Sequence, residues 1–336
     1  MNLLRSIWSR IDAFLAAILL TVAFAAVMPA RGEAATAVSW LADAAIVLLF
    51  FMHGAKLSPE EALVGARHWR LHVMVFLSTF ALFPLLGMSA RFLAPNFLPG
   101  PLWAGVILLT ALPSTVQASM VFTSVAGGNV PAAMCSATAS SLLGVFLTPL
   151  IAGLLLSGHG VDVSARSILG IVVQLLLPFI AGQVLRRWIG GYLTRHPFAL
   201  KSVDYGSVLI LVYAAFSHGV VDGIWHQIDV EDLLKVALVD IALLATVMTI
   251  LTFGSRQLGF SRADEIAIVF CGSKKSLVNG VPIATLLFAG HVGLVVIPLM
   301  LFHQTQLMVC ATLARRYAAR RGTVDEPLPA LPATSA

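Results

Sequence analysis

The chain has 336 residues, of which 59% are hydrophobic and only 11% are charged, whereas a soluble domain carries about 25% charged residues. This composition excludes an ordinary soluble protein and indicates a polytopic membrane protein. The net charge of +5 does not indicate nucleic-acid binding, because the basic residues divide between the two sides of the membrane, as described below.

Ten apolar segments that could span a bilayer follow one another along the chain, since a membrane helix needs about 20 mainly apolar residues. They begin near Ile11, Val38, Leu71, Leu102, Pro131, Ser167, Val203, Asp232, Ala263 and Val292. The first segment, from Ile11 to Met28, also resembles a secretory signal, but its apolar run is long for one. The sequence therefore predicts an all-α membrane protein with ten transmembrane helices.

Lysine and arginine residues separate cleanly between alternate connections of these segments. One side holds Arg31, Arg91, Arg166 and Lys235, and the other holds fifteen, namely Arg5, Arg10, Lys56, Arg67, Arg70, Arg186, Arg187, Arg195, Lys201, Arg256, Arg262, Arg315, Arg316, Arg320 and Arg321. Cytoplasmic connections retain positive charge, so both termini are predicted to be cytoplasmic, at a bacterial inner membrane. Lys274 and Lys275 are the two basic residues that no connection accommodates.

Two short matches between the halves of the chain indicate an inverted repeat. Residues 51–54 read FMHG and residues 216–219 read FSHG, while residues 126–130 read AGGNV and residues 288–292 read FAGHV. Five segments in each half would make the second half enter the membrane from the opposite side, as in many secondary transporters. We therefore predict five-helix repeats at residues 1–156 and 167–316, followed by a disordered cytoplasmic tail at residues 317–336.

The fourth and ninth segments are predicted to be broken at equivalent positions. Pro113 interrupts the fourth, and Gly272 together with Gly280-Val281-Pro282 interrupts the ninth, because proline removes a backbone donor and glycine favours irregular backbone. Paired interruptions of this kind indicate a transporter's binding site, since unwound backbone at membrane depth is tolerated only beside protein or water.

The position of Lys274 can be estimated from the length of the ninth segment. At 1.5 Å per residue, a helix that starts at Ala263 places Lys274 about 17 Å into a hydrocarbon core of about 30 Å. A charge at that depth is costly, and it marks a functional site facing a cavity by default. The alternative interpretation is a structural cation paired with Asp240 or Asp43.

Polar side chains gather around both breaks and on the helices that follow them. Serine and threonine in membrane helices often serve only to join helices or to bond the preceding turn, whereas His303 would relay protons or would be a hydrogen-bonded core histidine. The candidate binding residues are Ser114, Thr115, Gln117, Ser119, Ser273, Lys274, Lys275, Ser276, Asn279, His303 and Gln304.

Four stretches of the chain together resemble one family. They are ALPSTVQASM at residues 111–120, GGNVPAAMCSATASSLLG at 127–144, CGSKKSLVNGVP at 271–282 and PLMLFHQTQL at 298–307. The chain is similar to the bile acid:sodium symporter superfamily, and within it to an SBF-like branch of bacterial symporters related to the seventh vertebrate bile-acid carrier. The resemblance implies a core domain of helices three to five and eight to ten, and a panel domain of helices one, two, six and seven.

The resemblance also implies where sodium would bind and shows where this chain differs. Sodium-coupled members of the superfamily carry a glutamate and a glutamine in the ninth-helix break, where this chain has Lys274 and Lys275. Residual oxygens for sodium would be those of Ser114, Ser119, Ser136 and Thr138. A lysine here could also occupy the place of the cation.

We expect a secondary transporter that moves a small organic anion across the bilayer by alternating access, coupled to sodium or to protons through a lysine or His303. No cofactor is expected, no metal-ligand cluster is apparent, and Cys135, Cys271 and Cys310 suggest neither disulfide nor zinc. An alternative is a membrane regulator of ion homeostasis that transports little itself. A remote one is an intramembrane enzyme, although the GxGD, HExxH and GxSxG motifs are missing from the sequence.

Overall fold

The computed structural model describes residues 13–56, 68–156, 165–221, 223, 228–288 and 292–321. Within these residues every regular element is helical. The elements are α2 (Ala13–Val27), α3 (Glu33–Lys56), α5 (Trp69–Leu77), the π-helix η2 (Ser78–Leu82), α6 (Phe83–Leu93), α7 (Gly100–Ala111), α8 (Val116–Val125), α9 (Val130–Leu156), α10 (Ala165–Arg195), α11 (Pro197–Val221), α12 (Val230–Gln257), α13 (Arg262–Gly272), α14 (Leu277–Leu287) and α15 (Val292–Arg321).

The predicted all-helical membrane fold class is confirmed in this part of the chain. Eight helices or helical runs, among them the interrupted run α13–α14, are long and apolar enough to cross a membrane, and a ninth span results if the bent pair α7 and α8 is taken as one. Each of the ten expected segments coincides with a helix or a helix pair, but α2 has only 15 residues, about 22 Å at the usual rise. The chain is thus an integral membrane protein with eight or nine candidate spans among the described residues.

Two predicted features lie wholly or partly outside the described residues. Arg5, Arg10, Arg67 and residues 322–336 of the predicted tail are not among them. The rest of the predicted tail is helical, because α15 continues to Arg321, past the predicted boundary at residue 316.

The two predicted breaks occur in the structure. α7 ends at Ala111 and α8 begins at Val116, with Leu112 and Thr115 in extended conformations, and the two helices differ in direction by 63°. In the ninth segment the helix stops at Gly272 and resumes at Leu277. Both interruptions are four residues long and carry polar side chains.

The additional break predicted at residues 280–282 is wrong. Pro282 lies inside α14, which continues for five more residues to Leu287. A proline inside a helix removes one backbone hydrogen bond, and a membrane helix tolerates this loss where neighbouring helices surround it. The surroundings here are dense, because the α13–α14 run is almost fully buried.

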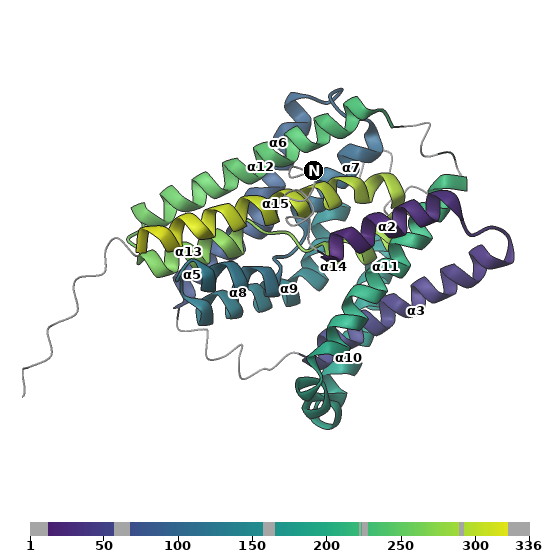
Figure 1. Cartoon of the computed structure of the whole chain (residues 1–336), viewed down its shortest axis with the longest axis horizontal. Coiled ribbons are helices and arrows are strands. Elements are labelled where there is room, and N and C mark those ends of the chain that lie inside the picture. The colour runs from purple at the N-terminus through teal and green to yellow at the C-terminus, as the bar shows by residue number, and fades with distance from the viewer. Residues whose placement is uncertain are drawn as a thin grey trace, which may run out of the picture.

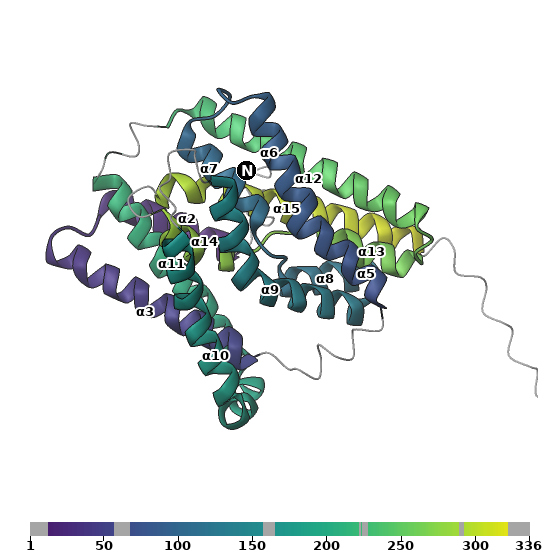
Figure 2. The same cartoon turned by 180° about the vertical axis from the view of Figure 1, so that it is seen from behind.

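The helices form two groups (Figures 1 and 2). α3, α10 and α11 extend together away from the body of the molecule, and α2 packs on α11. The body contains the remaining helices, with α15 against α7 and α12, and α8 against α9. The groups meet where α11 contacts α14 and α15, and where α10 contacts α9.

Two glycines allow α3 and α10 to pack with their backbones in contact. A Cβ atom on Gly54 would overlap the carbonyl of Phe179, and one on Gly182 would overlap the carbonyl of Phe51. Small residues permit such close approach between membrane helices. The α3–α10 pair is therefore fixed at a single crossing point one residue after His53.

Candidate functional site

The two breaks are hydrogen-bonded to each other near the centre of the body. The backbone N–H of Ser276 donates to the carbonyl of Pro113 at 2.9 Å. Helix ends leave carbonyls without intrahelical partners, and hydroxyl groups satisfy those at the end of α13. Ser114 Oγ donates to Cys271 at 2.6 Å, Ser119 Oγ to Phe270 at 3.3 Å, and Ser78 Oγ to Gly272 at 2.9 Å.

Lys275 satisfies the corresponding end of α7. Its Nζ donates to the carbonyls of Thr79, Thr110 and Leu112 at 2.8, 2.7 and 2.8 Å, and it lies 4.2 Å from the ring centre of Phe83. We call these three oxygens the carbonyl cage. The side chain is 1% exposed, and a cation is favoured at a helix C-terminus by the helix dipole.

The backbone of Lys275 is hydrogen-bonded as well as its side chain. Its N–H donates to Gln306 Oε1 and its carbonyl accepts from Gln306 Nε2, both at 2.9 Å. Gln306 Nε2 also lies 3.2 Å from His303 Nδ1. The HQTQ stretch of α15 therefore supports the ninth-segment break directly.

Lys274 has a different environment although it is the next residue. Its Nζ lies 3.8 Å from the ring centre of Phe122, and it has no nitrogen or oxygen hydrogen-bond partner among the described residues. Its polar neighbours are the thiols of Cys310 and Cys271. The side chain is fully buried, so its amino group is held chiefly by aromatic and thiol contacts.

The alternative pairing of a lysine with an acid on a neighbouring helix is wrong for both acids considered. Neither lysine forms an ion pair with a described carboxylate, since Lys275 bonds only carbonyls and Lys274 has no oxygen acceptor. Asp240 is buried with no hydrogen bond to either oxygen, and Asp43 is exposed on α3.

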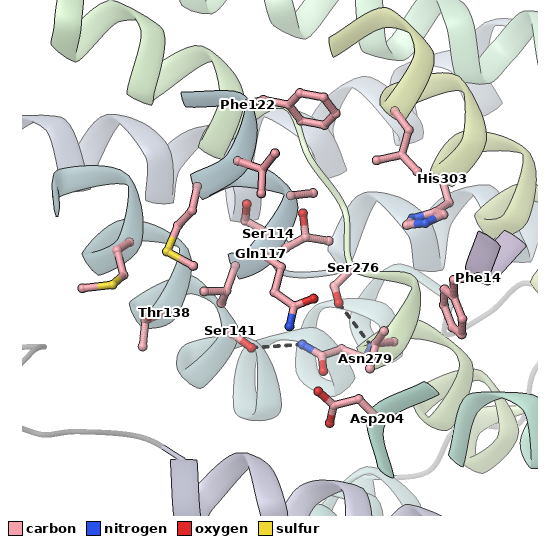
Figure 3. A pocket seen from close by; sticks show the side chains of 18 of the residues that line it. Phe14, Ser114, Gln117, Phe122, Thr138, Ser141, Asp204, Ser276, Asn279 and His303 are labelled. Carbon is pink, nitrogen blue, oxygen red and sulfur yellow. Dashed lines mark hydrogen bonds between the residues drawn. The ribbon is translucent and has the colours of Figure 1, made fainter. Parts of the chain in front are cut away.

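A cavity of about 1090 Å³ lies beside the crossing of the breaks (Figure 3). It brings together six of the eleven candidate residues, and Thr138 of the sodium candidates also lines it. The six are Ser114, Thr115, Gln117, Ser276, Asn279 and His303. Asn279 Nδ2 donates to Ser141 Oγ at 3.1 Å across the cavity floor.

The other five candidate residues do not line this cavity. Lys274, Lys275 and Ser119 lie buried behind it, as described above. Ser273 Oγ donates to Val269 within its own helix at 2.6 Å, and the Oε1 atom of Gln304 is buried without a described hydrogen-bond partner. The cavity is therefore built from the C-terminal side of each break, where α8 and α14 begin, and the lysines belong to the packed crossing.

The candidate sodium oxygens are distributed over separate contacts. Ser114 Oγ and Ser119 Oγ are 3.4 Å apart and both face carbonyls of α13. Ser136 Oγ is instead 2.6 Å from His72 Nδ1, and Thr138 lines the cavity. No group of three or more histidine, cysteine or acidic side chains that could hold a metal was found in the described ranges.

Several cavity residues were not singled out from the sequence. His53 and Asp204 face each other, with Nε2 to Oδ1 at 3.7 Å, and Arg315 and Arg316 also line the cavity. In the sequence, His53 appears only as part of the repeat, and the arginines only as topological signals. Asp204 lies one residue after the expected start of its segment, and no motif there marks it as a site residue.

Aromatic side chains complete the apolar wall of the cavity. Phe14, Phe179 and Tyr205 come from α2, α10 and α11, and the rings of Phe14 and Tyr205 stack at 4.0 Å. The cavity thus has one polar side, from the breaks, and one side from α2, α3, α10 and α11 that combines aromatic rings with the His53–Asp204 pair.

At the far end of α13, ion pairs and hydrogen bonds join four helices. Arg256 donates two hydrogen bonds of 2.9 Å to Glu265, which also accepts from Tyr317 at 3.0 Å. Asn129 Nδ2 donates to Asp264 at 2.8 Å. These contacts fix α13 against α12, α15 and the start of α9, so the break is held from both directions.

Comparison with known proteins identifies the family. The SBF-like CPA transporter family matches residues 12–319. The uncharacterized protein PA2026 of Pseudomonas aeruginosa is 53% identical over 92% of this chain and 94% of its own length. The protein named "Putative symporter YfeH" of Escherichia coli is 50% identical over 91% and 93%. Sodium/bile acid cotransporter 7 of Xenopus tropicalis is 29% identical over 89% and 90%.

The family match covers nearly the whole chain, and its helices, breaks and cavity agree with a membrane transporter. The predicted resemblance to the bile acid:sodium symporter superfamily is confirmed, and the chain belongs to the SBF-like CPA transporter family.

Proposed function

We propose that this protein is a secondary active transporter that moves an organic anion across the bacterial inner membrane by alternating access. The observation that carries the proposal is that the N-termini of α8 and α14 border the same cavity, through Thr115 and Gln117 on one side and Ser276 and Asn279 on the other. Helix N-termini present N–H groups and positive partial charge, which favour anions. No side chain caps the N-terminus of α8, whereas Ser276 Oγ accepts from the N–H of Asn279 at that of α14, so α8 offers uncapped N–H groups and α14 adds its dipole. Together they favour a carboxylate, sulfate or phosphate group.

The remaining lining favours an amphipathic substrate. Aromatic and aliphatic side chains form one wall, and Arg315 and Arg316 add two cations to the lining. The volume of about 1090 Å³ is slightly above the usual range for small-molecule sites, about 300–1,000 Å³. The name of the vertebrate relative, a sodium/bile acid cotransporter, supports a large amphipathic anion as the first compound to test.

The two helix groups suggest how access would alternate. We assign α2, α3, α10 and α11 to the panel domain and the other helices to the core domain, within two inverted five-helix repeats and ten spans. The matching breaks at residues 112–115 and 273–276 and the separate packing of the two groups support this assignment. The cavity lies between the groups, so that rocking one against the other would change its exposure. Both termini are then cytoplasmic.

Lys275 suggests that coupling does not use sodium at the crossing. Sodium is a hard cation that prefers several oxygen ligands, and the carbonyl cage supplies three oxygens that the ammonium already contacts at 2.7–2.8 Å. We therefore propose that the ammonium group of Lys275 stabilises the carbonyl cage permanently, in the place of an exchangeable cation such as sodium.

The proposal is tested by ligand screening and uptake with the purified full-length protein. Anions of different size and headgroup, beginning with taurocholate, would be added at equal ionic strength in sodium or in choline, with thermal unfolding and liposome uptake as readouts. We expect selected amphipathic anions to raise the midpoint of unfolding equally in both salts. Failure of every anion tested to stabilise the protein or to enter liposomes would refute the proposal.

A matched pair of variants locates the site. Gln117→Ala removes an exposed amide from the cavity lining, and Gln257→Ala removes one from the exposed end of α12 outside it. We expect only the first to weaken the response to the anion, and equal responses would show that the anion binds elsewhere.

A further inference from the structure

The cavity contains one group that conflicts with anion binding. Asp204 on α11 is the only carboxylate among the described residues that line it. Its side chain is 11% exposed, and that of His53 on α3, 3.7 Å away, is 22% exposed. In Figure 3, Asp204 lies on the side of the cavity opposite Phe122. A charged carboxylate in this position would repel an anionic substrate.

Among the described residues, no permanently charged side chain forms an ion pair with Asp204, so nothing fixed cancels its repulsion of an anion. Asp204 Oδ1 accepts no hydrogen bond from the described residues. The other ionisable groups of the lining are Tyr205 on its own helix and His303, Arg315 and Arg316 on α15, while Lys201 lies 5.2 Å from the ring of Tyr205. The helices α2, α10 and α14 contribute only Phe14, Phe179, Ser276, Val278 and Asn279.

A proton would resolve the repulsion reversibly. When the His53–Asp204 pair gains one proton, its net charge becomes more positive by one, and the cost of bringing an anion into the same low-dielectric cavity falls. Linkage is reciprocal, so a bound anion must equally raise the affinity of the pair for the proton. The coupled pair therefore holds more protons with the anion bound than without it, whichever atom carries the proton.

The positions of the two sites suit coupled transport. His53 and Asp204 belong to α3 and α11 of the panel, whereas the helix N-termini that attract the anion belong to α8 and α14 of the core. The proton and the anion would thus bind on opposite sides of the interface that must close. Lys275 already occupies the carbonyl cage, so the exchangeable cation has to bind elsewhere.

We propose that the His53–Asp204 pair is the proton-binding site that couples anion transport to the proton gradient, an inference that rests on the proposed transport function. In each cycle one proton from the medium adds to the pair as the anion binds and leaves on the other side with the anion released. No other covalent bond changes. For a singly charged anion the cycle is electroneutral.

The test separates binding, exchange and gradient-driven accumulation. Wild-type protein, Asp204→Asn and Asp43→Asn would be reconstituted in liposomes with radiolabelled taurocholate as the probe. Asp43 is a matched control, because it is an exposed carboxylate on α3 outside the cavity. Wild type and Asp43→Asn should accumulate the anion up to about tenfold per unit of inward-directed pH difference, without a response to membrane potential.

The Asp204→Asn protein should behave differently in only one of the assays. It should bind and exchange taurocholate at equal concentrations on both sides, but show no accumulation above onefold in a pH gradient. Gradient-driven accumulation like that of the wild type would overturn the proposal. So would loss of taurocholate binding itself, since Asp204 would then be a substrate contact.

A second variant and a spectroscopic measurement test the proton site whether or not taurocholate is a substrate. His53→Gln should shift the pH profile of uptake while leaving exchange intact, and His218→Gln on the exposed end of α11 should not. In pH-difference infrared spectra of the purified protein, a carboxyl or imidazole band of the pair should disappear in Asp204→Asn or His53→Gln and persist in Asp43→Asn. Absence of any band from both Asp204 and His53 overturns the proton site even if taurocholate is not a substrate. A band from the pair without any anion response supports the proton site and contradicts only the transport proposal.

Discussion

The crossing of the broken helices and the cavity beside it use the same two breaks in opposite ways. In the crossing, the carbonyls that end α7 and α13 are bonded by Lys275, Ser114 and Ser119, and the segment is almost fully buried. In the cavity, no side chain caps the N-terminus of α8, and the Oγ1 atom of Thr115 is buried without a described partner. The negative helix ends are thus closed by the protein, while the positive end of α8 remains available to a ligand.

The largest effect should follow from emptying the carbonyl cage. Lys275→Ala removes three charge-assisted hydrogen bonds of 2.7–2.8 Å and leaves buried carbonyls unpaired, each of which costs about 1–3 kcal/mol. The midpoint of thermal unfolding should fall steeply. Methylammonium or sodium should recover part of it in the variant only. A variant as stable as the wild type would show that the cage does not depend on the ammonium.

A smaller loss is expected at the other end of the crossing. Ser114→Ala removes the hydrogen bond of 2.6 Å to the carbonyl of Cys271 and leaves that acceptor buried, which costs about 1–3 kcal/mol. Thermal unfolding of Ser114→Ala against Ser39→Ala, which removes an exposed hydroxyl from α3, measures the difference. Equal midpoints would mean that the bond contributes nothing.

Substitution of Lys274 should change the stability of the protein in the opposite direction from substitution of Lys275. Lys274→Met keeps the length of the side chain but removes a buried group that lacks an oxygen acceptor, and burying such a polar group costs about 1–3 kcal/mol in proteins. The midpoint of unfolding should therefore rise by a few degrees or stay constant. A fall comparable with that of Lys275→Ala would contradict the contrast between the two lysines.

The smallest effect on stability is expected within the cavity. Gln117 is exposed there, and surface substitutions usually change stability by less than about 0.5 kcal/mol. Gln117→Ala should unfold at the wild-type temperature, and only its response to anions should weaken. Loss of stability in this variant would place Gln117 in the packed crossing instead.

Much of the fold could be predicted, because apolar runs, proline and glycine have local physical consequences. The break at Pro113 was predicted correctly. The residues that follow it are polar, so a continuous helix through them would add little apolar packing to offset the hydrogen bond that proline removes. Pro282 did not break its helix, because the surrounding packing outweighs one lost hydrogen bond. Packing of this kind depends on residues distant in the sequence, and a local pattern does not contain it.

The site was predicted only in part for the same reason. Helix length predicts a deep position for Lys274, but the acceptors of Lys275 are backbone carbonyls of Thr79, Thr110 and Leu112, and a backbone acceptor has no signature in sequence. His53 and Asp204 lie 151 residues apart at the ends of two segments, so neither suggested the other. Their proximity results from the packing of α3 against α11.

The backbone contact at Gly54 and Gly182 has a mechanical consequence. Because sliding either helix would bring the β-carbon of a neighbouring residue against the carbonyl that now faces a glycine, α3 and α10 should move as one rigid body. His53 precedes Gly54 and Phe179 supplies the opposing carbonyl, and both line the cavity. Any displacement of this helix pair therefore carries an ionisable side chain and an aromatic wall together, so that proton access and substrate space would change in the same movement.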